Sequence, residues 1–249
     1  MRRSIAWGLL SIAGILLLWH LASVVADRYF LPGPAQALSA LTDLLQDSRF
    51  WGHIAASFRR ITLGTFLGLA AALPLGILMG RFPRVDRLLG AYFRFIYPIP
   101  KVVFMPIVVV LFGIGDGAKI FLIFLAVFFQ LCIIIRDSTA ALDRELTEVM
   151  MSMSAGRGAV LRHLILPGIL PGVLTALKAA LGTSVALLMI TELFASSSGL
   201  GYFIMNCMDS RKYPEMYAGI LTLMLMSAAM YAFLEILEHF NCKWRGQER

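Results

Sequence analysis

Residues 142–171 have the sequence LDRELTEVMMSMSAGRGAVLRHLILPGILP, and they lie between two long apolar runs at about 118–135 and 170–194. This is the one place where a mostly hydrophobic chain carries a patterned, water-facing segment of such length. If the flanking runs cross a membrane, the segment is a loop on one side of that membrane. The loop therefore bears on both the fold class and the place to look for function.

The composition indicates a membrane protein. Of the 249 residues, 59% are hydrophobic and 15% are charged, and the mean hydropathy of +0.79 is far above that of soluble domains. Three widely separated cysteines fit neither a metal-ligand spacing nor a disulfide framework, so we expect no metal site. The chain lacks a P-loop sequence and is not expected to hydrolyse a nucleotide itself. The net charge of +7 would suggest nucleic acid in a soluble protein, but here we expect no such partner.

Six apolar runs predict an all-α integral membrane protein with six transmembrane helices. They lie at about 5–26 and 61–80, in a third segment that ends near 112, and at about 118–135, 170–194 and 218–237. Their lengths are close to the ~20 residues that a helix needs to cross a bilayer. A cleaved signal peptide is the alternative for the first run, because Val24-Val25-Ala26 has the small residues of a cleavage site. The length of that run favours a retained span.

Three further features lie between or within these runs: an amphipathic stretch, charged residues among prolines, and regularly spaced glycines. From about Ala35, leucines at helical spacing predict an amphipathic helix at the membrane surface, with a solvated linker helix as the alternative. In the third segment, Arg94 and Lys101 lie among prolines, which excludes an uninterrupted lipid-facing helix. The stretch 94–101 either lines protein or a water-filled cavity, or it is interfacial. Glycines spaced by four residues in the second run predict helix packing.

The basic residues predict the orientation. With six spans and a cytoplasmic N-terminus, 12 of the 22 Lys and Arg lie inside, seven lie outside, and the other three lie at or within spans. This bias has the sign of the positive-inside rule and places both termini and the 142–171 loop in the cytoplasm. The inside set is Arg2, Arg3, Arg81, Arg84, Arg87, Arg136, Arg144, Arg157, Arg162, Lys243, Arg245 and Arg249; the outside set is Arg28, Arg49, Arg59, Arg60, Lys119, Arg211 and Lys212; Arg94, Lys101 and Lys178 are the other three.

An apolar stripe recurs at helical spacing in the loop, and charged residues take the other face. We call it the loop stripe; its members are Leu142, Leu146, Val149, Met150 and Met153. The pattern predicts a short amphipathic helix that Gly156-Arg157-Gly158 ends. A stripe rich in methionine suits a groove on a partner, because methionine adapts its shape easily. A helix lying on the inner membrane surface is the alternative.

The same loop resembles the cytoplasmic E-A-A-x3-G-x9-I-x-L-P motif in permease subunits of bacterial binding-protein-dependent ABC importers. The match runs with full spacing from Glu148 to Leu166-Pro167. Val149 and Met150 stand for the two alanines, Ser154 for the glycine and Leu164 for the isoleucine. Four more segments extend the resemblance from about residue 54 to the C-terminus, and towards the nitrate/sulfonate/taurine subgroup: Ser57-Phe58-Arg59-Arg60-Ile61, Tyr97-Pro98-Ile99-Pro100-Lys101, Leu111-Phe112-Gly113-Ile114-Gly115 and Ser198-Gly199-Leu200-Gly201-Tyr202.

The resemblance implies a type I importer fold, with the loop as a coupling helix between the fourth and fifth spans. A separate ATP-binding subunit, in two copies, would receive this helix and hold ATP and Mg, while this chain would bind no cofactor. Two permeases, expected as a homodimer, would form the path. A periplasmic or lipid-anchored binding protein would deliver the solute. The residues implied in the ATPase contact are Glu148, Val149, Met150, Ser154, Ala155, Gly156 and Arg157.

The resemblance also predicts the organisation of the chain in the bacterial inner membrane. Residues 1–27 would be an N-terminal transmembrane helix, 28–56 a periplasmic linker with the interfacial helix, 57–240 the permease domain and 241–249 a cytoplasmic tail. The expected solute is a small anion such as a sulfonate, taurine or a nitrate-like ion. A neutral vitamin or a pyrimidine precursor is the alternative.

Polar side chains within the spans are candidates for the translocation path, although each could equally satisfy a neighbouring helix: Lys101, Gln130, Thr183, Ser184 and Glu192. An anionic solute would suit Lys101 or Lys178 better than Glu192. A self-contained secondary transporter would need coupling carboxylates and often an inverted repeat, but only Glu192 and Glu235 are candidates and no duplicated half is evident. A membrane enzyme would need clustered residues, but the four histidines lie far apart in the sequence.

Overall fold

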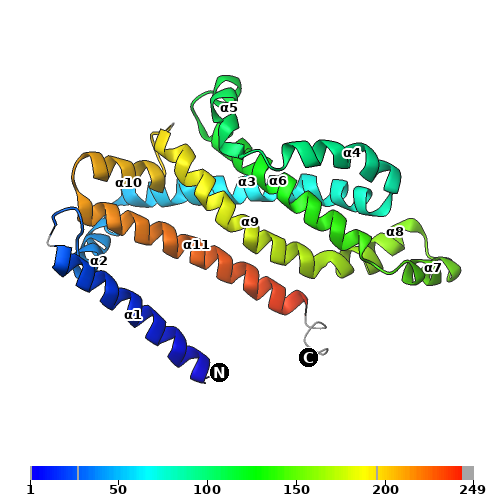
Figure 1. The fold of residues 1–249 in the computed structure, drawn as a ribbon, viewed down its shortest axis with the longest axis horizontal. Coiled ribbons are helices and arrows are strands. Elements are labelled where there is room, and N and C mark those ends of the chain that lie inside the picture. The colour runs from blue at the N-terminus through cyan, green and yellow to red at the C-terminus, as the bar shows by residue number, and fades with distance from the viewer. Residues whose placement is uncertain (1, 27, 195, 243–249) are drawn as a thin grey trace. The chain divides into compact units, whose positions relative to one another are not determined.

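The computed structural model describes residues 2–26, 28–194 and 196–242, and every regular element among them is helical (Figure 1). The elements are α1 (Arg2–Ala26), α2 (Pro34–Leu44), α3 (Ser48–Arg81), α4 (Pro83–Ile96), a 3-10 turn (Lys101–Phe104), α5 (Met105–Phe112), α6 (Asp116–Ala140), α7 (Arg144–Ser152), α8 (Arg157–Val160), a π turn (Leu161–Ile165), α9 (Leu166–Phe194), α10 (Leu200–Asp209) and α11 (Tyr213–Asn241). For these residues the all-helical prediction is confirmed.

Several helices are suited by length and composition to cross a membrane. Within the described ranges these are α3, the continuous stretch Arg157–Phe194, α6 and α11. The segments Pro83–Ile96 and Lys101–Phe112 meet the same criterion together, with a bend of 85° at the break, and would be a fifth crossing. Pro98 and Pro100 explain the break, because proline disfavours helical backbone before it and lacks an N–H. The apolar part of α1, Leu10–Ala26, is shorter, so six spans remain a prediction.

The helix α3 starts earlier than the hydropathy predicts. The sequence places the second span at about 61–80, whereas one continuous helix runs from Ser48 to Arg81. Residues 48–60 are less apolar but contain no proline, and a helix does not require apolar residues on its solvated turns. The helix expected from about Ala35 is confirmed as α2, which opens with Pro34 in its first turn, where a missing N–H costs little.

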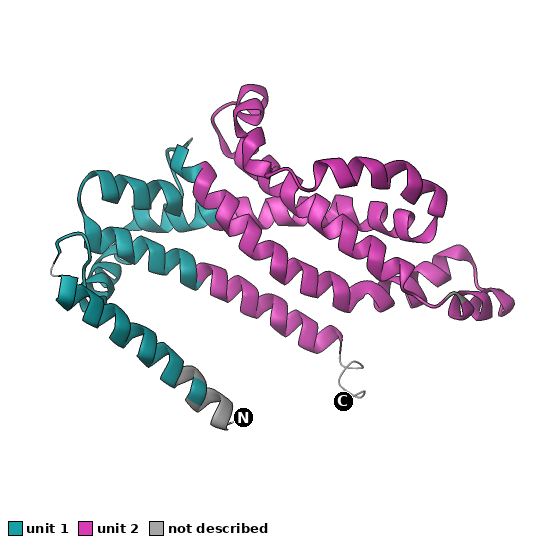
Figure 2. Ribbon diagram, in the orientation of Figure 1, with its two compact units in different colours: residues 1–57, 192–225 teal, residues 58–191, 226–249 magenta. Residues whose placement is uncertain are grey.

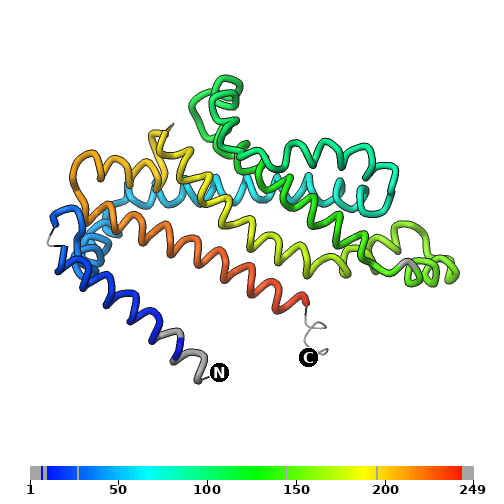
Figure 3. Tube along the Cα trace, in the orientation of Figure 1, coloured from blue at the N-terminus to red at the C-terminus, as the bar shows by residue number. Residues whose placement is uncertain are grey.

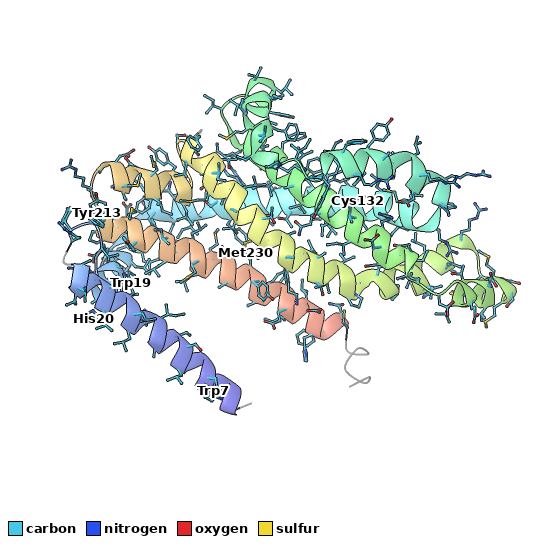
Figure 4. The ribbon with its side chains drawn as sticks, in the orientation of Figure 1. Trp7, Trp19, His20, Cys132, Tyr213 and Met230 are labelled. Atoms are coloured by element: carbon cyan, nitrogen blue, oxygen red, sulfur yellow. The ribbon has the colours of Figure 1, made fainter. Side chains whose placement is uncertain are left out.

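The chain divides into two compact units, residues 1–57 with 192–225 and residues 58–191 with 226–249 (Figure 2). In the first unit, aromatic contacts hold the last turns of α1. The ring of Trp19 stacks on that of Tyr217 with 5.7 Å between centroids, and its Nε1 donates to the carbonyl of Pro32 at 3.1 Å. Tyr29 meets Tyr213 edge to face at 5.3 Å (Figure 4 labels Trp19 and Tyr213). The end of α1 therefore lies at the start of α11.

In the second unit, α3 and α6 pack backbone against backbone, and both can be followed in Figure 3. A Cβ added at any of four glycines of α3 would lie only 2.5–2.8 Å from atoms of α6. These residues recur every four positions with buried Ala72 between them, and we call them the glycine row: Gly64, Gly68, Gly76 and Gly80. Small residues at this spacing let helix backbones approach closely. The packing predicted from the spaced glycines is confirmed.

The same contacts give the directions of the helices in the second unit. Gly64 lies beside Ile123 and Gly76 beside Ile135, so α3 and α6 run in parallel. Residues 82–115 between them must therefore return along the pair. Contacts of α9 with the end of α6, and of α11 with α9, show that each runs opposite to the helix before it; the pairs are Leu142 with Gly168, Ser138 with Gly172, Lys178 with Glu238, and Gly182 with Ser227 across one groove.

Candidate functional site

The predicted loop helix exists as α7, and its N-terminal end is capped from the sequence. The carboxylate of Asp143 accepts the N–H of Glu145 at 2.9 Å, which satisfies one of the backbone donors that the first turn leaves open. Asp143 thereby fixes where α7 begins. A short isolated helix of nine residues needs such a contact, because its own backbone bonds are few.

The other end of α7 is a sharp left-handed turn at Ser154. The N–H of Ser154 bonds the carbonyl of Met151, and the N–H of Ala155 bonds the carbonyl of Met150. This pair of bonds is the Schellman arrangement, in which the residue after the cap takes a left-handed conformation. Ser154 has a φ of 60°, which glycine adopts at no cost and other residues with strain. The helix thus ends before the predicted Gly156-Arg157-Gly158, at the position where the importer motif has glycine.

The apolar side chains of α7 face away from the chain. Leu146, Val149 and Met153 are 52%, 54% and 78% exposed, whereas Thr147 on the opposite face is 4% exposed. The other two members of the loop stripe, Leu142 and Met150, are half-buried, and Leu142 packs against the first turn of α9. An exposed apolar surface on a short polar loop indicates contact with something outside the chain. A partner groove and a membrane surface both meet that requirement.

The seven residues implied in ATPase contact lie in α7, in the turn that follows it and at the first residue of α8. Two of them, Met150 and Ala155, are half-buried. The other five are exposed: Glu148, Val149, Ser154, Gly156 and Arg157. The structure thus brings the whole predicted set onto one short segment.

Lys101, one of the path candidates, is used by the backbone at the break between α4 and α5. Its Nζ donates to the carbonyls of Ile96, Tyr97 and Ile99 at 2.6, 3.1 and 2.9 Å, and it lies 5.1 Å from the ring centre of Phe129. An ammonium group has three N–H donors, so all three are engaged. Lys101 therefore caps the end of α4, where the helix leaves carbonyls without partners.

The three neutral path candidates differ in their surroundings. Ser184 is fully buried, and its Oγ donates to the carbonyl of Ala180 at 2.9 Å and lies 3.4 Å from Oγ1 of Thr65. Gln130 is half-buried, and among the residues that the structure describes its side chain makes no hydrogen bond. Thr183 is exposed. Gln130 and Thr183 therefore keep polar atoms available, which in a membrane span requires water or a partner nearby.

Glu192 is fully buried in the first unit, where it receives hydrogen bonds from α3 and α10. The hydroxyl of Ser57 lies 2.9 Å from both carboxylate oxygens, and the N–H of Gly201 donates to Oε2 at 2.8 Å. The Ser57 oxygen in turn accepts the N–H of Leu200 at 2.8 Å. A buried carboxylate requires such donors, since without them its desolvation is very costly.

Three successive backbone N–H groups at the start of α10, those of Gly199, Leu200 and Gly201, donate to side chains of other helices. Besides the bonds to Ser57 and Glu192, the N–H of Gly199 donates to Nδ1 of His53 at 3.1 Å. We call this set the α10 clamp. A carboxylate at a helix N-terminus is also favoured by the helix dipole. The sequence placed Glu192 among the path candidates. It marked Ser57 only as part of a segment that resembles the importer family, and it gave no local signal for His53.

Two arginines of α3 pair with the first residue of α6, a contact that sequence reasoning missed. Arg60 is 2% exposed and donates from Nε and Nη2 to Oδ1 of Asp116 at 2.7 and 2.6 Å. Arg59 donates to Oδ2 of the same carboxylate. The sequence did carry a signal, because Arg60 is four residues before Gly64 and so continues the glycine row.

A second missed pair joins α9 and α11. The Nζ of Lys178 lies 2.5 Å from Oε2 of Glu238, and Oγ1 of Thr175 lies 3.4 Å from Oε1. The ammonium also lies 5.7 Å from the ring centre of Tyr231. Lys178, which the sequence suggests for an anionic solute, is thus already neutralised by a carboxylate within the chain.

The sequence of this chain is similar to those of known transport proteins. Residues 72–240 match the family described as "Binding-protein-dependent transport system inner membrane component". The taurine transport system permease protein TauC of Escherichia coli (strain K12) is 30% identical, over 92% of this chain and 86% of its own length. The formylaminopyrimidine transport permease protein ThiX of Halalkalibacterium halodurans is 27% identical, over 94% of each chain.

The helical arrangement also has a solved counterpart. A bacterial alginate ABC transporter, solved in complex with an alginate pentasaccharide-bound periplasmic protein, contains a chain that superposes with a TM-score of 0.63. The two chains are 16% identical, and the likeness covers 94% of this chain and 95% of that one. At this identity the comparison supports the fold.

Proposed function

Because the chain belongs to the family of binding-protein-dependent transport system inner membrane components, we propose that it couples solute passage to a separate ATPase through α7. As a member of that family it is a multi-pass permease subunit of an ABC importer, and ATP hydrolysis belongs to another subunit. The observation that carries the proposal is the exposed loop stripe on a helix fixed at both ends.

In this proposal the exposed members of the loop stripe, Leu146, Val149 and Met153, lie in a groove of the ATP-binding subunit, and the ends of α7 contact the edge of that groove. Glu148, Val149 and Met150 supply the helix side of that contact, while Ser154 to Arg157 supply the turn. ATP-bound and ADP-bound ATPase would hold α7 differently, and this difference would shift the permease between outward and inward states. Without differential contact the nucleotide could not bias the path.

The proposed complex contains two ATP-binding subunits, which bind ATP and Mg, and two copies of this chain as a homodimer. A periplasmic or lipid-anchored binding protein completes it on the opposite face. The exposed stripe supports the ATPase contact. The alginate transporter, solved with its periplasmic protein, supports the binding protein by analogy of fold.

We propose six spans with both termini in the cytoplasm and with residues 1–27, 28–56, 57–240 and 241–249 as the four regions given above. The alternating directions of the helices in the second unit support this arrangement. If α3 and its parallel partner α6 both cross in one direction, residues 82–115 cross in the other, and α9 and α11 follow in turn. The C-terminus then lies on the same side as α7, which agrees with the basic residues.

For the translocation path we propose the five polar residues in two roles. Gln130 and Thr183 would meet the solute, since their polar groups are available in the span. The other three would hold the structure around the path and would not contact the solute, since their polar atoms already bond the backbone or neighbouring side chains: Lys101, Ser184 and Glu192. The contacts thus support a path lined mainly by neutral groups.

The solute that we propose is a small anion of the sulfonate or taurine kind, with a pyrimidine precursor as the second candidate. TauC supports the first and ThiX the second. Neutral donors such as the Gln130 amide suit either solute. Uptake of radiolabelled taurine and of formylaminopyrimidine by proteoliposomes, each with its binding protein, would decide between them.

The coupling proposal is tested by co-purification. A tagged permease solubilised with its ATPase should retain that subunit, and Val149→Glu should reduce the retained amount about tenfold, since a charge enters an apolar contact. Met151→Glu is the matched control, because Met151 is 52% exposed on α7 but lies outside the loop stripe. Equal retention of the ATPase by the Val149 variant and the unchanged permease would contradict the proposal.

A further inference from the structure

The buried face of α7 is attached to the rest of the permease by one side-chain hydrogen bond among the described residues. Nη1 of Arg81, the last residue of α3, donates to Oγ1 of Thr147 at 3.2 Å. Thr147 is 4% exposed on a helix whose other face is open. The bond joins α7 to a residue 66 positions earlier in the chain, in addition to the chain connections of α7 to α6 and α8, which flank it in sequence.

The surroundings of this bond leave room for movement. A polar hollow of about 190 Å³ lies between the ends of α3 and α6, lined by Arg81, Asp86, Arg136 and Leu142 among others. Asp86 in α4 pairs with Nε of Arg136 at 2.9 Å on its wall. A displacement of α7 would therefore reach Arg81 without first compressing a packed core, because close-packed interiors resist deformation but a hollow does not.

Between Arg81 and Arg60, α3 is packed against α6. The glycine row leaves no space for even a Cβ between the two backbones, and Ala72 in the same row is fully buried. At the far end the buried guanidinium of Arg60 is paired with Asp116. Two helices in such continuous contact are expected to move together, since sliding would drive the backbone of one into the side chains of the other.

We infer that Arg81 and Thr147 are positioning residues that pass the movement of α7 to the α3–α6 pair as one rigid body, and hence to the Arg60–Asp116 end. This inference rests on the proposed role of α7 as the ATPase contact. It adds that α3, distant in sequence, receives the displacement directly. It also explains why Thr147 is buried within an otherwise exposed helix.

The test uses the complete importer in proteoliposomes with its binding protein. Thr147→Val keeps the shape of the side chain but removes the acceptor. It should lower the stimulation of ATP hydrolysis by the loaded binding protein about tenfold, the change that corresponds to one hydrogen bond with a charged group. The amount of ATPase held by the permease should not change. Thr147→Ser, which restores the hydroxyl, should recover the stimulation.

Two further variants make the outcome decisive. Ser152→Ala is the matched control, because the Ser152 hydroxyl lies on the same helix and donates to the carbonyl of Val149; it should leave stimulation unchanged. If Thr147→Val does not assemble, Arg81→Gln removes the charged donor from the other side and should give the same loss. Full stimulation in whichever of these two variants assembles would overturn the inference.

The failure of this inference is distinguishable from failure of the proposed function. If Val149→Glu releases the ATPase while Thr147→Val keeps full stimulation, α7 is the ATPase contact but Arg81 does not carry its movement. If Val149→Glu has no effect on ATPase retention, the role of α7 itself is wrong, and the inference falls with it.

Discussion

Ser154 shows a conflict between side chain and backbone at a single residue. Its φ of 60° is that of glycine, and it occupies the glycine position of the importer motif. We predict that Ser154→Gly stabilises the turn by about 1 kcal/mol, because an L-residue in the left-handed region costs that much. The midpoint of heat inactivation of the solubilised permease, measured by size exclusion after heating, should rise. A fall in that midpoint would contradict the prediction that Ser154 strains the turn.

The α10 clamp gives a prediction for Gly199. A Cβ there would lie 2.3 Å from the carboxyl carbon of Glu192, and φ is +111°. Gly199→Ala should therefore destabilise the permease by at least about 2 kcal/mol through overpacking and strain. Gly52→Ala, in the same unit, is the control, because an added Cβ there meets nothing within 4 Å. The midpoint of heat inactivation should be lower for Gly199→Ala than for Gly52→Ala. Similar midpoints would contradict the close packing of Gly199 against Glu192.

At the scale of helices, Lys178 and Glu238 tie α9 to α11, with side chains only 15% and 23% exposed. Lys178→Met alone should destabilise the permease by about 3 kcal/mol, because it removes the positive charge that neutralises the largely buried carboxylate of Glu238. The double change Lys178→Met with Glu238→Leu should recover most of that loss. Thermal unfolding of these two variants and of Glu238→Leu alone measures the coupling between the sites.

The same pair of variants tests whether Lys178 serves the solute instead. If the ion pair is structural, the double variant should take up solute at close to the normal rate. Loss of uptake in a double variant that is as stable as the unchanged protein would assign Lys178 to solute binding.

Helix positions were largely predictable, because apolar runs and prolines are local features of the sequence. The break near Pro98 and Pro100 and the start of α2 at Pro34 followed from them. The start of α3 did not follow from them, because hydropathy indicates which residues lie in the membrane, and this helix begins before those residues. Pairings were also not predictable. Arg60 with Asp116 and Ser57 with Glu192 join residues 56 and 135 positions apart, and one sequence alone does not show which distant residues meet.

For the candidate site, the loop helix and its apolar stripe were predictable from periodicity. The end of the helix was not, because the sequence placed it at Gly156-Arg157-Gly158 and the left-handed turn lies at Ser154. The burial of Thr147 was not, because a threonine on the polar face of a short helix gives no sign that an arginine from α3 reaches it. The different surroundings of the path candidates were not predictable for the same reason. Lys101 and Glu192 appear in the sequence as charges within spans, and only the folded chain shows their backbone partners.

At the scale of the whole molecule, the central claim is that α7 links this permease to its ATPase. The most direct measurement is ATP hydrolysis by the reconstituted importer with and without loaded binding protein, comparing the unchanged permease with Glu148→Arg. Glu148 is exposed on α7, so the charge reversal should leave folding and membrane insertion intact. We predict that the binding protein no longer stimulates hydrolysis in the variant and that uptake stops. Unchanged stimulation and uptake with Glu148→Arg would contradict it.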